Sequence, residues 1–193
     1  MIVWSSIPKL STLISLVWCL SEIALGRLRH STGSSSGKVD RSSLRLLWAT
    51  IIPAVSVGCY LGARGTGYVA AGAAAVSMCG LVFIIVGLII RWVAILTLKS
   101  HFTTDVSIQS AHRLATSGIY GIVRHPAYSG SLLSFAGLGL TFANWLSTGV
   151  ILVPILCAFL YRIKVEEEAL RGHFGEGYTA YRSKVKCLLP LIY

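Results

Sequence analysis

Long apolar runs separated by short polar segments form the main pattern of this chain. A helix needs roughly 20 apolar residues to cross the hydrocarbon core of a bilayer, and runs of that order recur along the sequence. They predict transmembrane helices over residues 10–25, 44–63, 68–90, 126–142 and 145–161, and the third can continue as helix through residue 98. The predicted fold is therefore all-α: a polytopic membrane helix bundle of about five transmembrane helices.

The polar segments between these runs predict where the chain leaves the bilayer. Residues 27–43 are rich in Ser, Gly and basic residues, which is typical of a solvated loop. A tight turn is expected at residues 64–67, and residues 99–121 are polar enough to lie outside the membrane. From Arg162 onward, the charged sequence predicts a surface helix followed by a tail.

Composition supports a membrane protein rather than an ordinary soluble domain. Of the 193 residues, 54% are hydrophobic and only 12% are charged, whereas about 25% of residues are charged in a typical soluble domain. Five cysteines are present without any CxxC pair, so neither a disulfide framework nor a metal site is expected.

The positive charge is distributed unevenly about the predicted helices. The net charge is +10, and with five helices, fifteen of the 17 Lys and Arg residues fall on one side of the membrane. Because cationic loops stay on the cytoplasmic side, we expect the N-terminus outside and the C-terminus in the cytoplasm. Binding to nucleic acid is not expected, since the basic residues form short clusters between apolar runs rather than a stripe with exposed aromatic residues.

Small residues are concentrated in the second and third predicted helices. Gly58 and Gly62 form a GxxxG pattern, which lets two membrane helices approach closely. The pattern favours packing inside the bundle over a dimer face, and the oligomeric state stays open.

The first cluster of polar residues that could bind a ligand or take part in catalysis spans residues 112–130. Pro126 suits the first turn of a membrane helix, because its missing N–H has no helical partner there. The free N–H groups of that turn favour an anionic ligand group. The aromatic and imidazole side chains in this cluster can hydrogen-bond a ligand, and aromatic faces also hold cations such as a sulfonium. These side chains belong to His112, Tyr120, His125 and Tyr128.

The second cluster follows the last apolar run and contains Arg162 and three successive acids from Glu166. If the helix continues, Arg162 and Glu166 are four residues apart and share a face. The alternative is an interfacial anchor with an ordinary salt bridge. Successive acids are unusual for an anchor, because the headgroup surface is usually anionic.

Together the two clusters resemble the isoprenylcysteine carboxyl methyltransferase family. The resemblance extends from about Arg91 to the C-terminus. Its first half consists of Thr97-Leu98, Phe102-Thr103, His112-x-Leu114, Gly118-x-Tyr120 and Arg124-His125-Pro126-x-Tyr128-x-Gly130. Its second half consists of Arg162-x-x-x-Glu166-Glu167-x-x-Leu170, Phe174-Gly175-x-x-Tyr178-x-x-Tyr181 and Pro190.

The resemblance implies an S-adenosylmethionine-dependent methyltransferase with a cytosol-facing cofactor pocket. It places the acceptor-side arginine at Arg162 and counts Arg162 and Glu166 as the catalytic pair. It implies cofactor contacts from His112, Arg113, Leu114, Ala115, Tyr120, His125, Pro126, Ala127, Tyr128 and Glu166. This chain departs from the family pattern at Lys99, Asp105 and Ala115, which concerns the outer edge of the pocket.

The implied organisation is a single domain, with N-terminal transmembrane helices over residues 1–98 and a catalytic region over residues 99–193. The implied reaction methylates a lipophilic acceptor that enters from the bilayer, with the carboxylate of an isoprenylcysteine-like or other lipid-like molecule as the expected group. Two other enzyme classes stay open: a phospholipid-type N-methyltransferase and an NADPH-dependent membrane sterol-type reductase. A membrane scaffold or carrier is the non-enzyme alternative, and the sequence leaves the acceptor's identity open.

Overall fold

The structure is a computed structural model that describes residues 13–14, 17–18, 38–98 and 114–190. The described part is helical and contains no β-strand. Its elements are α2 (Lys38–Arg64), α3 (Ala73–Leu98), the 3₁₀ turn η2 (Gly118–Gly121), α4 (Pro126–Leu140), α5 (Trp145–Phe174) and α6 (Glu176–Lys184).

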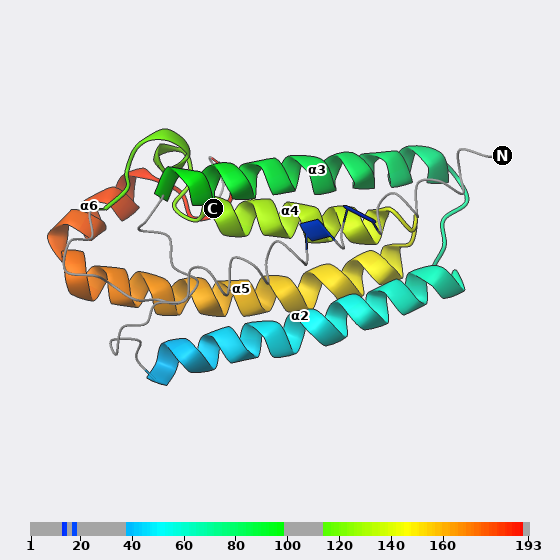
Figure 1. Cartoon of the computed structure of the whole chain (residues 1–193), viewed down its shortest axis with the longest axis horizontal. Helices are drawn as coiled ribbons and strands as arrows, with labels where there is room; N and C mark the ends of the chain where they lie inside the picture. The colour runs from blue at the N-terminus through cyan, green and yellow to red at the C-terminus, as the bar shows by residue number, and fades with distance from the viewer. Residues whose placement is uncertain (1–12, 15–16, 19–37, 99–113, 191–193) are drawn as a thin grey trace.

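The four long helices lie side by side and run along the same direction (Figure 1). α4 and α5 lie between α3 on one side and α2 on the other, and the short α6 lies at one end of the bundle. α2 and α4 begin at this end, and α3 and α5 finish there. Because one end of each of the four helices lies here, residues far apart in sequence can form one site at this end.

Glycine residues set the close contact between α3 and α4. A Cβ added at Gly87 would lie 2.4 Å from the Gly130 carbonyl oxygen, and one added at Gly137 would lie 2.5 Å from the Gly80 carbonyl oxygen. The two contacts are seven residues apart on each helix, so backbone packs against backbone over two turns. Small residues that permit such an approach are the usual basis of helix packing in membranes.

The GxxxG pattern of α2 packs inside the bundle, as expected. A Cβ on Gly58 would lie 2.3 Å from Ile151 of α5, and one on Gly62 would lie 2.5 Å from the Phe142 ring. Ser147 of α5 adds a hydrogen bond of 2.8 Å from its hydroxyl to the Gly58 carbonyl oxygen. Both glycines are therefore used for contact between α2 and the α4–α5 hairpin.

The membrane helices agree with the sequence in kind, but their bounds differ. Three described helices are long and apolar enough to cross a bilayer, namely Ser42–Arg64 within α2, Ala73–Leu98 and Trp145–Phe174. α4 has 15 residues, or about 22 Å of helix, so it is shorter than a full span. Most of the first expected helix, 10–25, lies outside the described residues.

The largest difference is at the end of α5. The charged sequence after Arg162 predicts a separate surface helix, whereas α5 continues unbroken through 30 residues to Phe174. At about 1.5 Å per residue this helix is about 45 Å long, well beyond the roughly 30 Å of a hydrocarbon core. The separate short helix is α6, which begins after Gly175 with its φ of 53°.

Candidate active site

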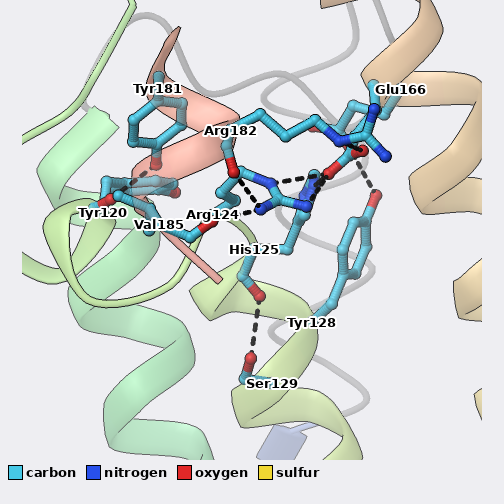
Figure 2. Close-up of polar contacts among 10 residues, drawn as sticks. Tyr120, Arg124, His125, Tyr128, Ser129, Glu166, Tyr181, Arg182 and Val185 are labelled. Carbon is cyan, nitrogen blue, oxygen red and sulfur yellow. Dashed lines mark hydrogen bonds and ion pairs between the residues drawn. The ribbon is translucent and has the colours of Figure 1, made fainter. Parts of the chain in front are cut away.

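The start of α4 and the charged end of α5 meet at the end of the bundle that carries α6 (Figure 2). His125 is the residue before α4, and Pro126 occupies the first turn, where a proline sacrifices no helical hydrogen bond. His125 is buried, and its ring lies against that of Tyr128 with a centroid distance of 5.7 Å. Both side chains point towards the acids of α5.

Glu166 joins the two segments. The Tyr128 hydroxyl donates a hydrogen bond of 2.9 Å to Glu166 Oε2, and His125 Nδ1 lies 3.9 Å from the same oxygen. The Glu166 side chain is 31% exposed, so it stands at the edge of the packed region. A partly exposed carboxylate with a tyrosine and an imidazole beside it can accept further hydrogen bonds from a cationic ligand.

Glu167, the next residue, is surrounded by positive side chains. Its Oε1 accepts from Arg124 Nε at 2.9 Å and lies 3.2 Å from His125 Nε2, while its Oε2 lies 3.2 Å from Arg182 Nε. Its side chain is only 9% exposed. Glu167 therefore ties α4, α5 and α6 together, whereas Glu166 keeps an exposed edge.

Arg162 lies one helical turn before Glu166 and is almost fully buried, with 2% exposure. Its Nη1 donates a hydrogen bond of 2.5 Å to the hydroxyl of Ser43, near the start of α2. The charges of Arg162 and Glu166 both act on the Tyr128 hydroxyl. A buried guanidinium thus stands close to the Tyr128–Glu166 pair.

Residues 185–188, which we call the C-terminal strap, pair with the segment at the start of α4. Lys186 forms a parallel bridge with Val123. The strap carbonyl oxygens accept from the N–H groups of Arg124 at 2.8 Å and His125 at 3.1 Å, and from the Ser129 hydroxyl at 2.6 Å. Arg124 also donates to the Val185 carbonyl oxygen. The two bonds from backbone N–H groups satisfy donors that precede α4 and would otherwise be unpaired.

The ionisable groups around the strap are shifted by burial and by Glu167. Burial opposes the charge of Arg124, but its hydrogen bond and ion pair with Glu167 outweigh that effect, so its pKa lies above the ordinary value. Burial raises the pKa of the Cys187 thiol to about 11, and the Glu167 charge adds to this. Burial likewise raises the pKa of Tyr181, to about 12. At neutral pH Arg124 therefore stays cationic, and the Cys187 thiol and the Tyr181 hydroxyl stay protonated.

One group of described residues has the spacing of metal ligands, although the sequence predicts no metal. Ligand atoms of His125, Glu167 and Cys187 lie within 4.8 Å of one another. The surroundings oppose a divalent cation, because Arg124 and Arg182 already place two positive charges on Glu167. The raised pKa of Cys187 also disfavours the thiolate that a metal requires.

The structure brings together the residues at the centre of the expected site. His125, Tyr128 and Glu166 are in contact, with Pro126, Ala127 and Arg162 adjoining them in the chain or on α5. Tyr120 is buried and donates to the Ala94 carbonyl oxygen at 3.3 Å. Leu114 and Ala115 are half-buried, and the expected contacts His112 and Arg113 lie outside the described residues.

Sequence reasoning did not single out the residues that hold this centre in place. Arg124 and Glu167 are parts of the motifs that carry the resemblance, and the sequence gives no separate signal for Arg182 or Ser43. Arg124 and Glu167 each adjoin an expected ligand contact, and such adjacency was the available signal. Ser43 gave none, because it lies 119 residues from Arg162.

Comparisons with known proteins match part of this chain to one family. Residues 79–172 match the isoprenylcysteine carboxyl methyltransferase (ICMT) family. A probable protein-S-isoprenylcysteine O-methyltransferase of Oryza sativa is 40% identical over 119 residues, which are 61% of this chain and 62% of the rice protein. Protein-S-isoprenylcysteine O-methyltransferase B of Arabidopsis thaliana is 36% identical over 61% of this chain and 60% of its own length. The chain thus spans about three fifths of these relatives.

A solved structure gives the same result in three dimensions. It is the eukaryotic intramembrane Ras methyltransferase ICMT, which matches 61% of this chain and 43% of its own chain with a TM-score of 0.54 and 34% identity. The matched family region includes α4 and Arg162, Glu166 and Glu167 of α5. Over this region, the chain matches the isoprenylcysteine carboxyl methyltransferase family.

Proposed function

We propose that this integral membrane protein transfers a methyl group from S-adenosylmethionine to the carboxylate of a lipophilic acceptor, of the isoprenylcysteine type or another lipid-like kind. The observation that carries the proposal is the meeting of Glu166 with His125 and Tyr128, 38 to 41 residues away in the chain, beside the buried Arg162. An acidic and a basic side chain thus lie one helical turn apart on α5, as needed for two ligands of opposite charge.

The residues around Glu166 fit the cationic methyl donor. Its carboxylate is partly exposed and has acceptor capacity beyond the Tyr128 hydroxyl, which suits an α-ammonium group. The aromatic ring of Tyr128, which lies beside that of His125, adds a face that favours positive charge. Bound there, S-adenosylmethionine would supply a methyl group already activated by its sulfonium.

Arg162 fits the acceptor. A carboxylate is ionised at neutral pH and needs no general base, so the protein must mainly orient it in line with the methyl group and exclude water. The planar fork of an arginine matches a carboxylate. When the carboxylate oxygen bonds to the methyl carbon and the carbon–sulfur bond breaks, both opposite charges disappear, leaving an ester and a thioether. A buried setting favours that loss of charge.

The placement of the site suits an acceptor from the membrane. Arg162 lies on a helix that is apolar enough to span the bilayer, so a lipid-like molecule could present its carboxylate there without leaving the hydrocarbon. The charge distribution of the sequence supports a cytoplasmic position for this end of the bundle.

Calorimetry on the purified full chain tests the cofactor class. We expect S-adenosylhomocysteine to bind and NADPH not to bind, because Glu166 offers a carboxylate to an ammonium group and repels the cofactor's phosphates. Binding of NADPH alone would favour the reductase alternative and overturn the proposal.

Two variants separate the roles of Arg162 and Glu166. Arg162→Ala should bind S-adenosylhomocysteine nearly normally, while methyl transfer falls by orders of magnitude. Glu166→Ala should weaken cofactor binding by about ten- to a hundredfold, since a hydrogen bond to a charged group is worth about 1.5–3 kcal/mol. If both variants bind cofactor and turn over like the unaltered protein, the pair is only a surface anchor.

A further inference from the structure

We propose that Ser43 is a positioning residue for the acceptor site: its hydroxyl fixes the Arg162 guanidinium in the orientation that receives the acceptor carboxylate. This inference rests on the proposed function and assigns part of it to α2. α2 lies outside residues 79–172, the region that matches the family, so the family match does not include it.

The contact joins two buried polar groups from distant parts of the chain. Ser43 is 1% exposed and Arg162 is 2% exposed, and their hydrogen bond measures 2.5 Å. Ser43 lies at the end of α2 that meets the charged end of α5 (Figure 1). A buried guanidinium loses much of its hydration, so each hydrogen bond that it keeps has a large effect on its orientation.

The chemistry of serine suits positioning. A serine hydroxyl is a neutral acceptor, so its hydrogen bond orients the guanidinium without cancelling the positive charge. A carboxylate in the same place would neutralise Arg162 and compete with an anionic acceptor. The Ser43 contact itself therefore adds no negative charge beside Arg162.

The same helix pair provides a matched control. Ser147 of α5 is fully buried and donates a hydrogen bond of 2.8 Å to the Gly58 carbonyl oxygen of α2. Like the Ser43–Arg162 bond, it connects α2 to α5 through a serine hydroxyl, but 15 residues before Arg162 along α5. Loss of either bond should affect packing alike, whereas only Ser43 should affect the acceptor.

The experiment measures how the protein distinguishes a carboxylate from its ester. The full chain in lipid nanodiscs is titrated with N-acetyl-S-farnesylcysteine and with its methyl ester, in the presence of S-adenosylhomocysteine. The acid carries the charge that Arg162 would bind, and the ester does not. We expect the unaltered protein to bind the acid at least tenfold more tightly, because the apolar part is the same in both molecules.

Ser43→Ala and Ser43→Cys should each reduce that preference at least fivefold, since methyl is no acceptor and sulfur is a weak one. Ser43→Thr, which keeps the hydroxyl, should retain the preference, and so should Ser147→Ala. Affinity for S-adenosylhomocysteine should stay within threefold in every variant, which verifies folding. Ser43→Cys, similar in size to serine, provides the test if Ser43→Ala does not fold.

Different results would contradict the proposed function and the positioning role of Ser43. If the unaltered protein shows no preference for the acid, Arg162 does not receive a carboxylate and the proposed function is wrong. If that preference exists but persists in Ser43→Ala or Ser43→Cys, the proposed function stands and Ser43 has no positioning role. If Ser147→Ala loses the preference equally, the effect belongs to helix packing, which also contradicts the inference.

Discussion

At the scale of single residues, Glu166 and Glu167 are chemically identical neighbours with different surroundings. Successive residues on a helix point about 100° apart, so one position faces the partly exposed edge and the next faces α4 and α6. Glu166 meets a hydroxyl, and Glu167 meets two guanidinium groups and an imidazole. We expect Glu166 to influence ligand binding and Glu167 to influence stability.

Glu167→Ala tests this division. It leaves Arg124 buried without its carboxylate, and breaking such a buried pair costs about 3 kcal/mol. Equilibrium unfolding in detergent should show that loss. Glu168→Ala is the matched control, because Glu168 is exposed and its removal should change the free energy of unfolding by less than about 0.5 kcal/mol. Equal stability of the two variants would contradict the role given to Glu167.

The centre of the candidate site could be predicted from residues, but its supports could not. Residue type and family resemblance point to His125, Tyr128 and Glu166, and the structure brings these together. The Ser43 contact depends on how α2 lies against α5, and no local pattern specifies that. Serine is also common in membrane helices for other reasons, so its presence in the chain carries little information.

At the scale of elements, the contact between α3 and α4 is the feature most sensitive to size. A Cβ added at Gly130 would lie 2.5 Å from the Gly87 carbonyl oxygen and 2.7 Å from the Arg91 nitrogen. Both neighbours are backbone atoms, so neither can rotate away. Any side chain at Gly130 must push α3 and α4 apart, and α4 carries the candidate site at its start.

Gly130→Ala should therefore lower the free energy of unfolding by about 1–3 kcal/mol, the usual cost of overpacking, and reduce cofactor affinity as well. Gly149→Ala is the control, because a Cβ there meets nothing within 4 Å; replacing a helical glycine by alanine should be neutral or slightly stabilising. Equilibrium unfolding and calorimetry with S-adenosylhomocysteine measure both. A Gly130→Ala protein as stable as Gly149→Ala would refute the close contact.

Helix type was easier to predict than helix length. Apolar runs identify the membrane helices, since the bilayer requires them, but the sequence changes from apolar to charged within α5 at Arg162 while the backbone does not. Hydropathy marks the membrane boundary there and not the end of the helix. The short α4 is likewise defined by its contacts with α3 and α5 rather than by the bilayer thickness.

At the scale of the whole molecule, the basic residues gather at the end of the helix bundle that carries the candidate site. The end that carries α6 also carries Arg124, Lys164, Arg171, Arg182 and Lys184, whereas the turn at 64–67 between α2 and α3 lies at the opposite end. The positive-inside rule then predicts a cytoplasmic position for α6 and the candidate site.

Single cysteines in a cysteine-free background test the orientation. Thr66→Cys and Lys184→Cys both replace exposed residues, at the α2–α3 turn and in α6. We expect a membrane-impermeant maleimide to label Thr66→Cys in intact cells and Lys184→Cys only after permeabilisation. A cysteine introduced between residues 27 and 43 should behave like Lys184→Cys, and its labelling from outside would reverse the predicted orientation.

The C-terminal strap also has a consequence for the order of synthesis. The N–H groups of Arg124 and His125 bond to carbonyl oxygens of Lys186 and Cys187, which follow every described membrane helix in the chain. Because synthesis runs from the N- to the C-terminus, α4 and α5 are made before these partners. The N–H groups at the start of α4 therefore stay without these bonds until almost the whole chain has been made. A chain truncated after α5 would lack the same two bonds.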